Sequence, residues 1–147
     1  MTAGTETGPV RTVDDADPAV RVWKRMRALV IDQHDRRRAA ADAVGLSPVR
    51  VRALLEVVRE PAMLSDLAER LSVDRPYATV VVDDLQRRGL VRRVPHAADR
   101  RCKIVSATTE GIEAAARASA IMNDPPAELR SLAAADLAEL DRVLGSF

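Results

Sequence analysis

Aromatic residues are scarce in this 147-residue chain, at 2% of the total: Trp23, Tyr77 and Phe147. A core with so few rings has to be built from aliphatic side chains, and the apolar content of 47% is high enough for one. Glycine is also rare, with six residues, and an Ala- and Leu-rich, Gly-poor composition favours helices. We therefore expect one ordinary domain with a mainly helical fold.

Other absences exclude several classes of protein. Cys102 is the single cysteine, so an internal disulfide framework and a cysteine-based zinc cluster are excluded. The two histidines, His34 and His96, have no metal-ligand spacing. No Gly-rich phosphate loop or Ser/His/Asp set is present, so we expect no enzyme activity, no cofactor and no metal. No apolar run approaches the roughly 18 residues of a membrane span, and the N-terminus lacks the pattern of a signal peptide. We expect a cytoplasmic protein with no membrane partner.

Charge is distributed unevenly along the chain although the net charge is only +1. Between Arg87 and Lys103 there are seven cations and one acid, a net charge of +6. Residues 21–38 carry +5, whereas residues 1–20, 39–86 and 124–147 each carry −3. One dense basic block on a neutral chain indicates an anionic partner at one place, and the alternative is a solvated charged face.

The N-terminal part of the chain predicts a flexible arm followed by a long helix. Residues 1–17 show no apolar periodicity and are expected to be the arm. Asp17 and Pro18 are typical of a helix start. Apolar residues then recur at Trp23, Met26 and Val30, with helical spacing. We expect this helix to run to about residue 44 and to end at Gly45. A long amphipathic helix at a terminus often packs against a second subunit.

The middle of the chain predicts three short helices and then a hairpin. Ser47-Pro48 begins a helix that ends before Pro61, Ser65 caps a helix over residues 66–71, and Asp74 caps a helix that runs to Arg88. The last of these has an inward set at helical spacing: Ala78, Val81, Val82 and Leu85. Residues 90–94 and 102–108 are rich in β-branched residues and predict two strands, joined by a polar loop over residues 95–101. A helix from Thr109 to Met122 follows, and a last helix carries Leu129, Leu132, Leu137, Leu140 and Leu144.

Two helices joined by a short turn and followed by a basic hairpin form a winged helix-turn-helix arrangement. Three motifs make this stretch resemble the MarR family of bacterial transcription regulators. They are Asp99-x-Arg101 followed by Ile104 and Ala107-Thr108, the run Leu67-Ala68-Glu69-Arg70-Leu71, and Asp83-x-Leu85 with Gly89-Leu90-Val91. The family has Leu where this chain has Ala107.

The resemblance implies a fold, a partner and a mode of regulation. The fold would be mainly α with a small β-hairpin wing, in a single domain over residues 18–147. Residues 18–45 and 110–147 would hold a homodimer together, and residues 46–109 would be the winged helix-turn-helix lobe. Two lobes would bind a roughly palindromic DNA operator as a repressor, released by a small-molecule effector or by cysteine oxidation.

The helix over residues 75–88 is the expected recognition helix, because an α-helix fits the major groove of DNA. Its outward residues Arg75, Tyr77, Thr79 and Val80 would contact DNA. A basic hairpin tip suits a narrow minor groove, so the wing adds Arg100 and Arg101, with Arg92, Arg93 and Lys103 as phosphate contacts. By resemblance to the family, Asp99 would stabilise the wing through Arg101 or through the hairpin backbone.

Two questions stay open at the level of sequence. Many family members carry Arg at Val80 and a basic or polar residue at Asp84, so that Val80, Asp83 and Asp84 weaken the expected groove face. The alternative function is a winged-helix dimer that acts as a protein-interaction module without specific DNA binding. The second question concerns Trp23, Met26 and Val30, which would form either the dimer core or part of an effector pocket.

Overall fold

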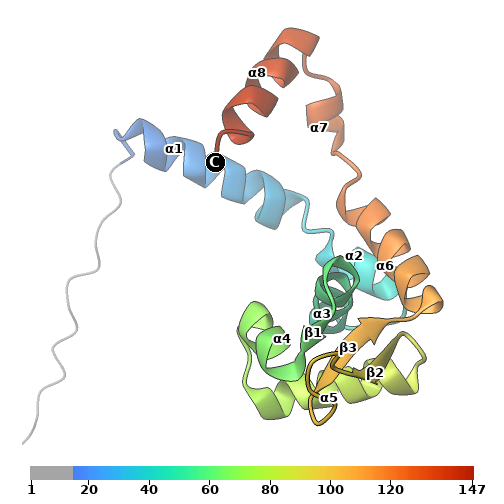
Figure 1. Ribbon diagram of the computed structural model, residues 1–147. Helices are drawn as coiled ribbons and strands as arrows, with labels where there is room; N and C mark the ends of the chain where they lie inside the picture. The colour runs from blue at the N-terminus through green and yellow to red at the C-terminus, as the bar shows by residue number, and fades with distance from the viewer. Residues whose placement is uncertain (1–14) are drawn as a thin grey trace, which may run out of the picture. The chain divides into compact units, whose positions relative to one another are not determined.

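The computed structural model of the protein describes residues 15–147. Most of the arm predicted for residues 1–17 lies outside the described residues. The chain divides after Asp35 into two compact units, and the second unit extends from Arg36 to Phe147. Figure 1 shows the helices and strands of both units.

The first unit contains helix α1, Pro18–Arg27, which continues as a π-helix η1, Ala28–Gln33. Asp17 caps α1 as predicted, because its Oδ1 accepts a hydrogen bond from the N–H of Ala19 at 2.9 Å. The prediction of one helix as far as residue 44 is wrong. Helical geometry ends at His34, and a separate helix α2, Arg37–Ala43, begins the second unit. The interruption was not predictable from a breaker residue, since no Gly or Pro lies between Ala28 and Arg37.

The helices of the second unit follow the predicted order: α3 (Pro48–Arg59), α4 (Leu64–Leu71), α5 (Arg75–Arg87) and α6 (Thr109–Met122). Asp74 caps α5, with its Oδ1 accepting from the N–H of Tyr77 at 2.7 Å. Helix α4 differs from the prediction, because it begins at Leu64 and its cap position is Met63. Ser65 therefore lies inside the helix, where its hydroxyl donates to Asp66 at 3.3 Å.

A three-stranded antiparallel sheet lies beside these helices, in the order β1-β3-β2. Strands β2 (Val91–Pro95) and β3 (Lys103–Ala107) form the predicted hairpin, with Val91 opposite Ala107 and Pro95 opposite Lys103. Strand β1, Ala62–Met63, pairs with β3 but was not predicted. Two residues are too few to show an alternating pattern.

The core of the second unit is aliphatic, as the composition requires. The residues that α5 was predicted to turn inward, Ala78, Val81, Val82 and Leu85, are all completely buried. The other large, fully buried side chains of this core are Leu54, Val57, Leu67, Leu71, Val91 and Val105. This core fixes α5 and the hairpin against α3, so that the outer surfaces of both are held on a rigid support.

The C-terminal part forms two helices where one was predicted, α7 (Ala127–Arg130) and α8 (Ala134–Leu144). In α8 the apolar residues Leu137, Leu140 and Leu144 are 38–47% exposed. Within residues 15–147, no helix has both the length and the apolar character needed to cross a membrane.

Candidate nucleic-acid interface

The outward face of α5 carries polar and apolar side chains together. Arg75, Tyr77 and Val80 are exposed, with Val80 at 54%, while Thr79 is half-buried. The Thr79 hydroxyl donates to the carbonyl oxygen of Arg75, one turn earlier, at 3.0 Å. This hydrogen bond leaves the Thr79 methyl group and the Val80 side chain as the apolar part of the face.

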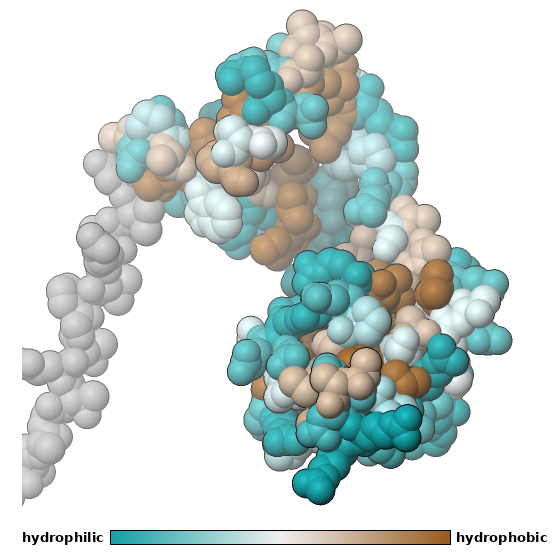
Figure 2. Space-filling view, viewed as in Figure 1, coloured by the Kyte–Doolittle hydropathy of each residue, from teal (hydrophilic) through white to brown (hydrophobic). Residues whose placement is uncertain are grey.

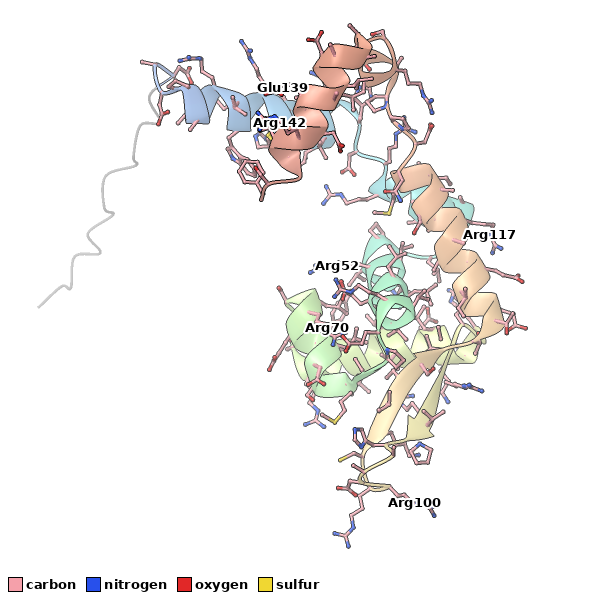
Figure 3. All side chains as sticks on the ribbon, turned by 45° about the horizontal axis from the view of Figure 1, so that its top comes forward. Arg52, Arg70, Arg100, Arg117, Glu139 and Arg142 are labelled. Atoms are coloured by element: carbon pink, nitrogen blue, oxygen red, sulfur yellow. The ribbon has the colours of Figure 1, made fainter. Side chains whose placement is uncertain are left out.

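The wing is the loop between β2 and β3, and its tip is held by Asp99. The Oδ1 atom of Asp99 accepts from the N–H of Arg101 at 2.9 Å, and its carbonyl oxygen accepts from the N–H of Cys102 at 3.0 Å. Asp99 therefore braces the hairpin backbone, one of the two roles that the resemblance implied. Arg100 and Arg101 are exposed, and Arg100 extends away from the tip (Figure 3).

The three cations of the strands are placed differently. Arg92 and Lys103 are exposed. Arg93 is turned toward α5, where its guanidinium donates to Asp83 at 2.6 Å and to Gln86 at 2.5 Å. Arg93 therefore ties β2 to α5, and Asp83 is a partner of this cation.

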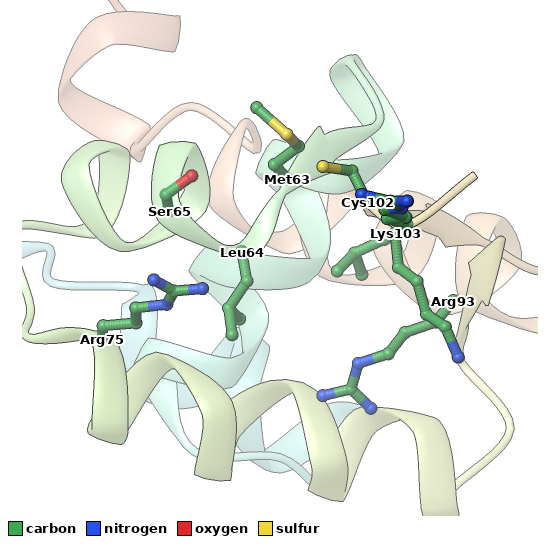
Figure 4. A pocket seen from close by; sticks show the side chains of 9 residues that line it. Met63, Leu64, Ser65, Arg75, Arg93, Cys102 and Lys103 are labelled. Atoms are coloured by element: carbon green, nitrogen blue, oxygen red, sulfur yellow. The ribbon is translucent and has the colours of Figure 1, made fainter. Parts of the chain in front are cut away.

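A hollow of about 350 Å³ lies where α5, the start of α4 and the wing meet (Figure 4). Four of its lining side chains are cationic. Arg75 comes from α5, Arg93 from β2, Arg101 from the wing loop and Lys103 from β3. The rest of its lining is Met63, Leu64, Ser65, Cys102 and Val105. Positive charges that converge on one concave surface concentrate anions there. All four cations are among the residues predicted to contact DNA, but the hollow itself was not predictable from sequence, because its lining includes Met63 of β1 and Leu64 and Ser65 of α4.

Asp84 does not lie on the outward face of α5, contrary to the sequence interpretation. It is 5% exposed and accepts hydrogen bonds from Arg50, Arg87 and Arg88. Arg87 and Arg88 follow Asp84 by three and four residues, a spacing that indicates helical ion pairs. That spacing was a signal that could have placed Asp84 correctly.

Trp23, Met26 and Val30 lie in the first unit and are exposed, by 65%, 37% and 62%. They line neither the hollow beside the wing nor a second hollow of about 300 Å³ in the other unit. This second hollow is mainly apolar and is lined by Arg37, Pro48, Val49, Val51, Arg52, Leu55 and Met122. Within residues 15–147, no three His, Cys, Asp or Glu side chains come close enough together to hold a metal ion.

Comparisons with known proteins agree with this geometry. Residues 44–101 match the model of the MarR family. Among solved structures, YusO from Bacillus subtilis is similar with a TM-score of 0.69 and 19% identity, over 91% of this chain and 96% of that one. The multiple antibiotic-resistance repressor MarR from Listeria monocytogenes has the same TM-score and identity, over 91% and 94%. A mutant of MepR from S. aureus, bound to an oligodeoxyribonucleotide, has a TM-score of 0.59 and 19% identity, over 86% and 94%. No curated protein matches the chain significantly in sequence.

Proposed function

Because residues 44–101 match the model of the MarR family, we propose that this chain is a sequence-specific DNA-binding transcription regulator that acts as a dimeric repressor. The observation that carries the proposal is the joint placement of the exposed face of α5, the basic wing and the cationic hollow between them. The MepR mutant of the same fold is bound to an oligodeoxyribonucleotide, which supports DNA as the partner.

In this proposal α5 enters the major groove and the wing reaches the flanking minor groove. Arg75 forks to a guanine edge or holds a phosphate, while Thr79 and Val80 contact thymine methyl groups. Arg100 and Arg101 at the wing tip enter the minor groove, where a narrow groove has an enhanced negative potential. Arg92 and Lys103 contact phosphates, and Arg93 adds positive charge to the hollow while it holds Asp83.

The alternative, a protein-interaction module, loses most of its basis. It was motivated by an acidic and apolar groove face at Val80, Asp83 and Asp84. Asp84 is buried among three arginines, and Asp83 is paired with Arg93 at 2.6 Å. The outward face of α5 therefore presents little unpaired negative charge to a DNA duplex.

We infer that a second copy of the chain covers two exposed apolar stripes, one in each unit. In α1 and η1 the stripe is Trp23, Met26 and Val30, and in α8 it is Leu137, Leu140 and Leu144. Apolar surface is visible over both α1 and α8, whereas the wing is hydrophilic (Figure 2). Exposed stripes of large apolar residues at helical spacing are typical of subunit interfaces.

A small-molecule effector belongs to the same proposal. The second hollow has an apolar lining from α3 and Met122, with the side chains of Arg37 and Arg52 also facing it. Its volume of about 300 Å³ is at the lower end of ligand pockets. It opens beside α3, which packs against α5, so that a molecule bound there would act on the support of the recognition helix.

Fluorescence anisotropy of the full chain tests the central claim. The titration uses duplex DNA from the intergenic region upstream of its own gene, a scrambled duplex of the same composition, and two salt concentrations. We expect nanomolar binding to the first duplex with a preference of about a thousandfold. Binding should weaken steeply with salt, since a protein that neutralises about 6–10 phosphates releases a similar number of counterions. Weak binding that is equal on both duplexes, followed by failure to enrich any sequence from a random library, would overturn the proposal.

A further inference from the structure

Asp84 is the one charged residue that is buried among residues 15–147. Its Oδ2 atom accepts from the Nε of Arg50 at 2.7 Å and from the Nε of Arg88 at 2.9 Å, and its Oδ1 atom accepts from Arg87. Burial alone raises the pKa of this carboxyl and is the largest single influence on it. The hydrogen bonds from Arg88, Arg87 and Arg50 together outweigh burial and hold its pKa below the ordinary value of 3.8. The carboxylate is therefore charged at neutral pH and fully engaged.

The three arginines play different structural parts. Arg50 belongs to α3, and its guanidinium also donates to the Ser47 hydroxyl at 3.0 Å at the start of that helix. Arg88 follows α5 and donates to the Gly45 carbonyl oxygen at 3.1 Å, in the turn before α3. Asp84 thus connects the recognition helix to α3 through Arg50 and to the preceding turn through Arg88. Arg87 is on α5 itself and its side chain is 72% exposed, so it connects nothing to α3.

We propose that Asp84 and Arg50 are positioning residues for DNA recognition, which hold α5 at the angle to α3 that its outward face needs to meet the bases. The inference rests on the proposed function and adds to it two residues that do not touch DNA. Apolar packing of Val81, Val82 and Leu85 keeps α5 on the core but is non-directional. The hydrogen bonds of a carboxylate with a guanidinium are directional and fix the rotation and slide of one helix on another.

Electrostatics and positioning predict opposite results when Asp84 is neutralised. Loss of one negative charge makes the lobe more basic, which by itself strengthens binding to any DNA. Loss of the connection to α3 leaves phosphate contacts in place but misaligns the contacts to bases, so only the preference for the specific sequence falls. The ratio of specific to non-specific affinity therefore separates the two effects.

The experiment compares two pairs of variants of the full chain. Arg50→Gln and Arg87→Gln each remove one positive charge and one hydrogen bond to Asp84, but only Arg50 lies on α3 and links that helix to α5. Asp84→Asn is matched by Glu113→Gln, which removes one negative charge from an exposed position on α6. Anisotropy is measured with the duplex that the wild-type chain selects from a random library and with a scrambled duplex. Circular dichroism and thermal melting show that each variant is folded at the measuring temperature.

We expect Arg50→Gln and Asp84→Asn to lower the ratio of specific to non-specific affinity by about tenfold, the size of one mismatched base pair. Arg87→Gln and Glu113→Gln should leave this ratio within about twofold, because base contacts are unaffected. Equal ratios for Arg50→Gln and Arg87→Gln would overturn the positioning role, even if Asp84→Asn failed to fold. A wild-type chain that selects no sequence would instead overturn the proposed function, and the inference with it.

Discussion

At the scale of single residues, Gly111 shows how closely α6 approaches the start of the hairpin. A Cβ atom at this position would lie 1.9 Å from the carbonyl oxygen of Leu90 and 2.9 Å from its carbonyl carbon. The neighbouring Thr108 fixes the same junction, because its hydroxyl donates to the Gly89 carbonyl oxygen at 2.6 Å and accepts from the Gly111 N–H at 3.0 Å. The start of α6 cannot move away from the residues that precede β2 without loss of the Thr108 hydrogen bonds.

We therefore expect Gly111→Ala to lower the free energy of unfolding by about 1–3 kcal/mol, the usual cost of overpacking. In an ordinary helix interior the same change stabilises by about 0.5–1 kcal/mol, so the sign of the effect is diagnostic. Urea denaturation measures it, with Ala116→Gly at an exposed position of α6 as the control. The free energy of unfolding of the control variant should fall by about 1 kcal/mol, through helix propensity alone. A Gly111→Ala chain as stable as the wild type would contradict the close approach.

Asp84 leads to a second prediction at this scale, in the dependence of stability on pH. Its pKa in the folded chain lies below the ordinary 3.8, so the folded state binds this proton less readily than the unfolded state does. Stability from the ion cluster is complete above the unfolded pKa and is lost as the pH falls through the folded pKa. The difference in unfolding free energy between wild type and Asp84→Asn should be largest near neutral pH and shrink below pH 3.8. A difference that stays constant down to acid pH would exclude this carboxylate as the source.

At the scale of elements, the periodicity of apolar residues predicted the helix faces and helix ends that depend on nearby residues in the sequence. The spacing of Ala78, Val81, Val82 and Leu85 gave the buried face of α5, and Asp74 and Gly89 gave its ends. Local sequence patterns did not predict features that depend on a residue far away in the sequence. Comparison with the family predicted Asp84 on the groove face, but Arg50, 34 residues away, makes its burial tolerable. Strand β1 likewise exists only because β3 pairs with it.

The wing is the element with the clearest single test. Arg101→Ala should weaken binding to the specific duplex by about 1–3 kcal/mol. Arg117→Ala is the matched control, since it removes the same charge from an exposed position on α6, away from the wing (Figure 3). Anisotropy titrations of both variants on one duplex measure the difference. If both variants lost the same affinity, the effect would come from overall charge, and the wing would have no specific part in binding.

At the scale of the whole molecule, the sequence predicted the order of elements but not the division into two units. The β-branched Val30 and Ile31 lower helix propensity only slightly. They do not mark the point at which helical geometry ends, at His34. Helical spacing predicted an apolar stripe of Trp23, Met26 and Val30, and these side chains are exposed, as are Leu137, Leu140 and Leu144 of α8. Local pattern identifies an apolar face, and only an assembly determines what covers it.

The proposed dimer gives the last prediction. Leu140 is 42% exposed in the middle of the α8 stripe, and a charge there would have to be desolvated in an interface. In a twofold dimer each substitution acts twice, so Leu140→Asp should weaken dimerisation by about a hundredfold or more, equivalent to about 2.7 kcal/mol. Val80→Asp makes a similar change at a residue of α5 that is 54% exposed, and it should remain dimeric while it loses DNA binding. Sedimentation velocity over a range of concentrations measures the oligomeric state of both variants, and anisotropy measures the DNA binding of Val80→Asp. A wild-type chain that is monomeric throughout would contradict the dimer.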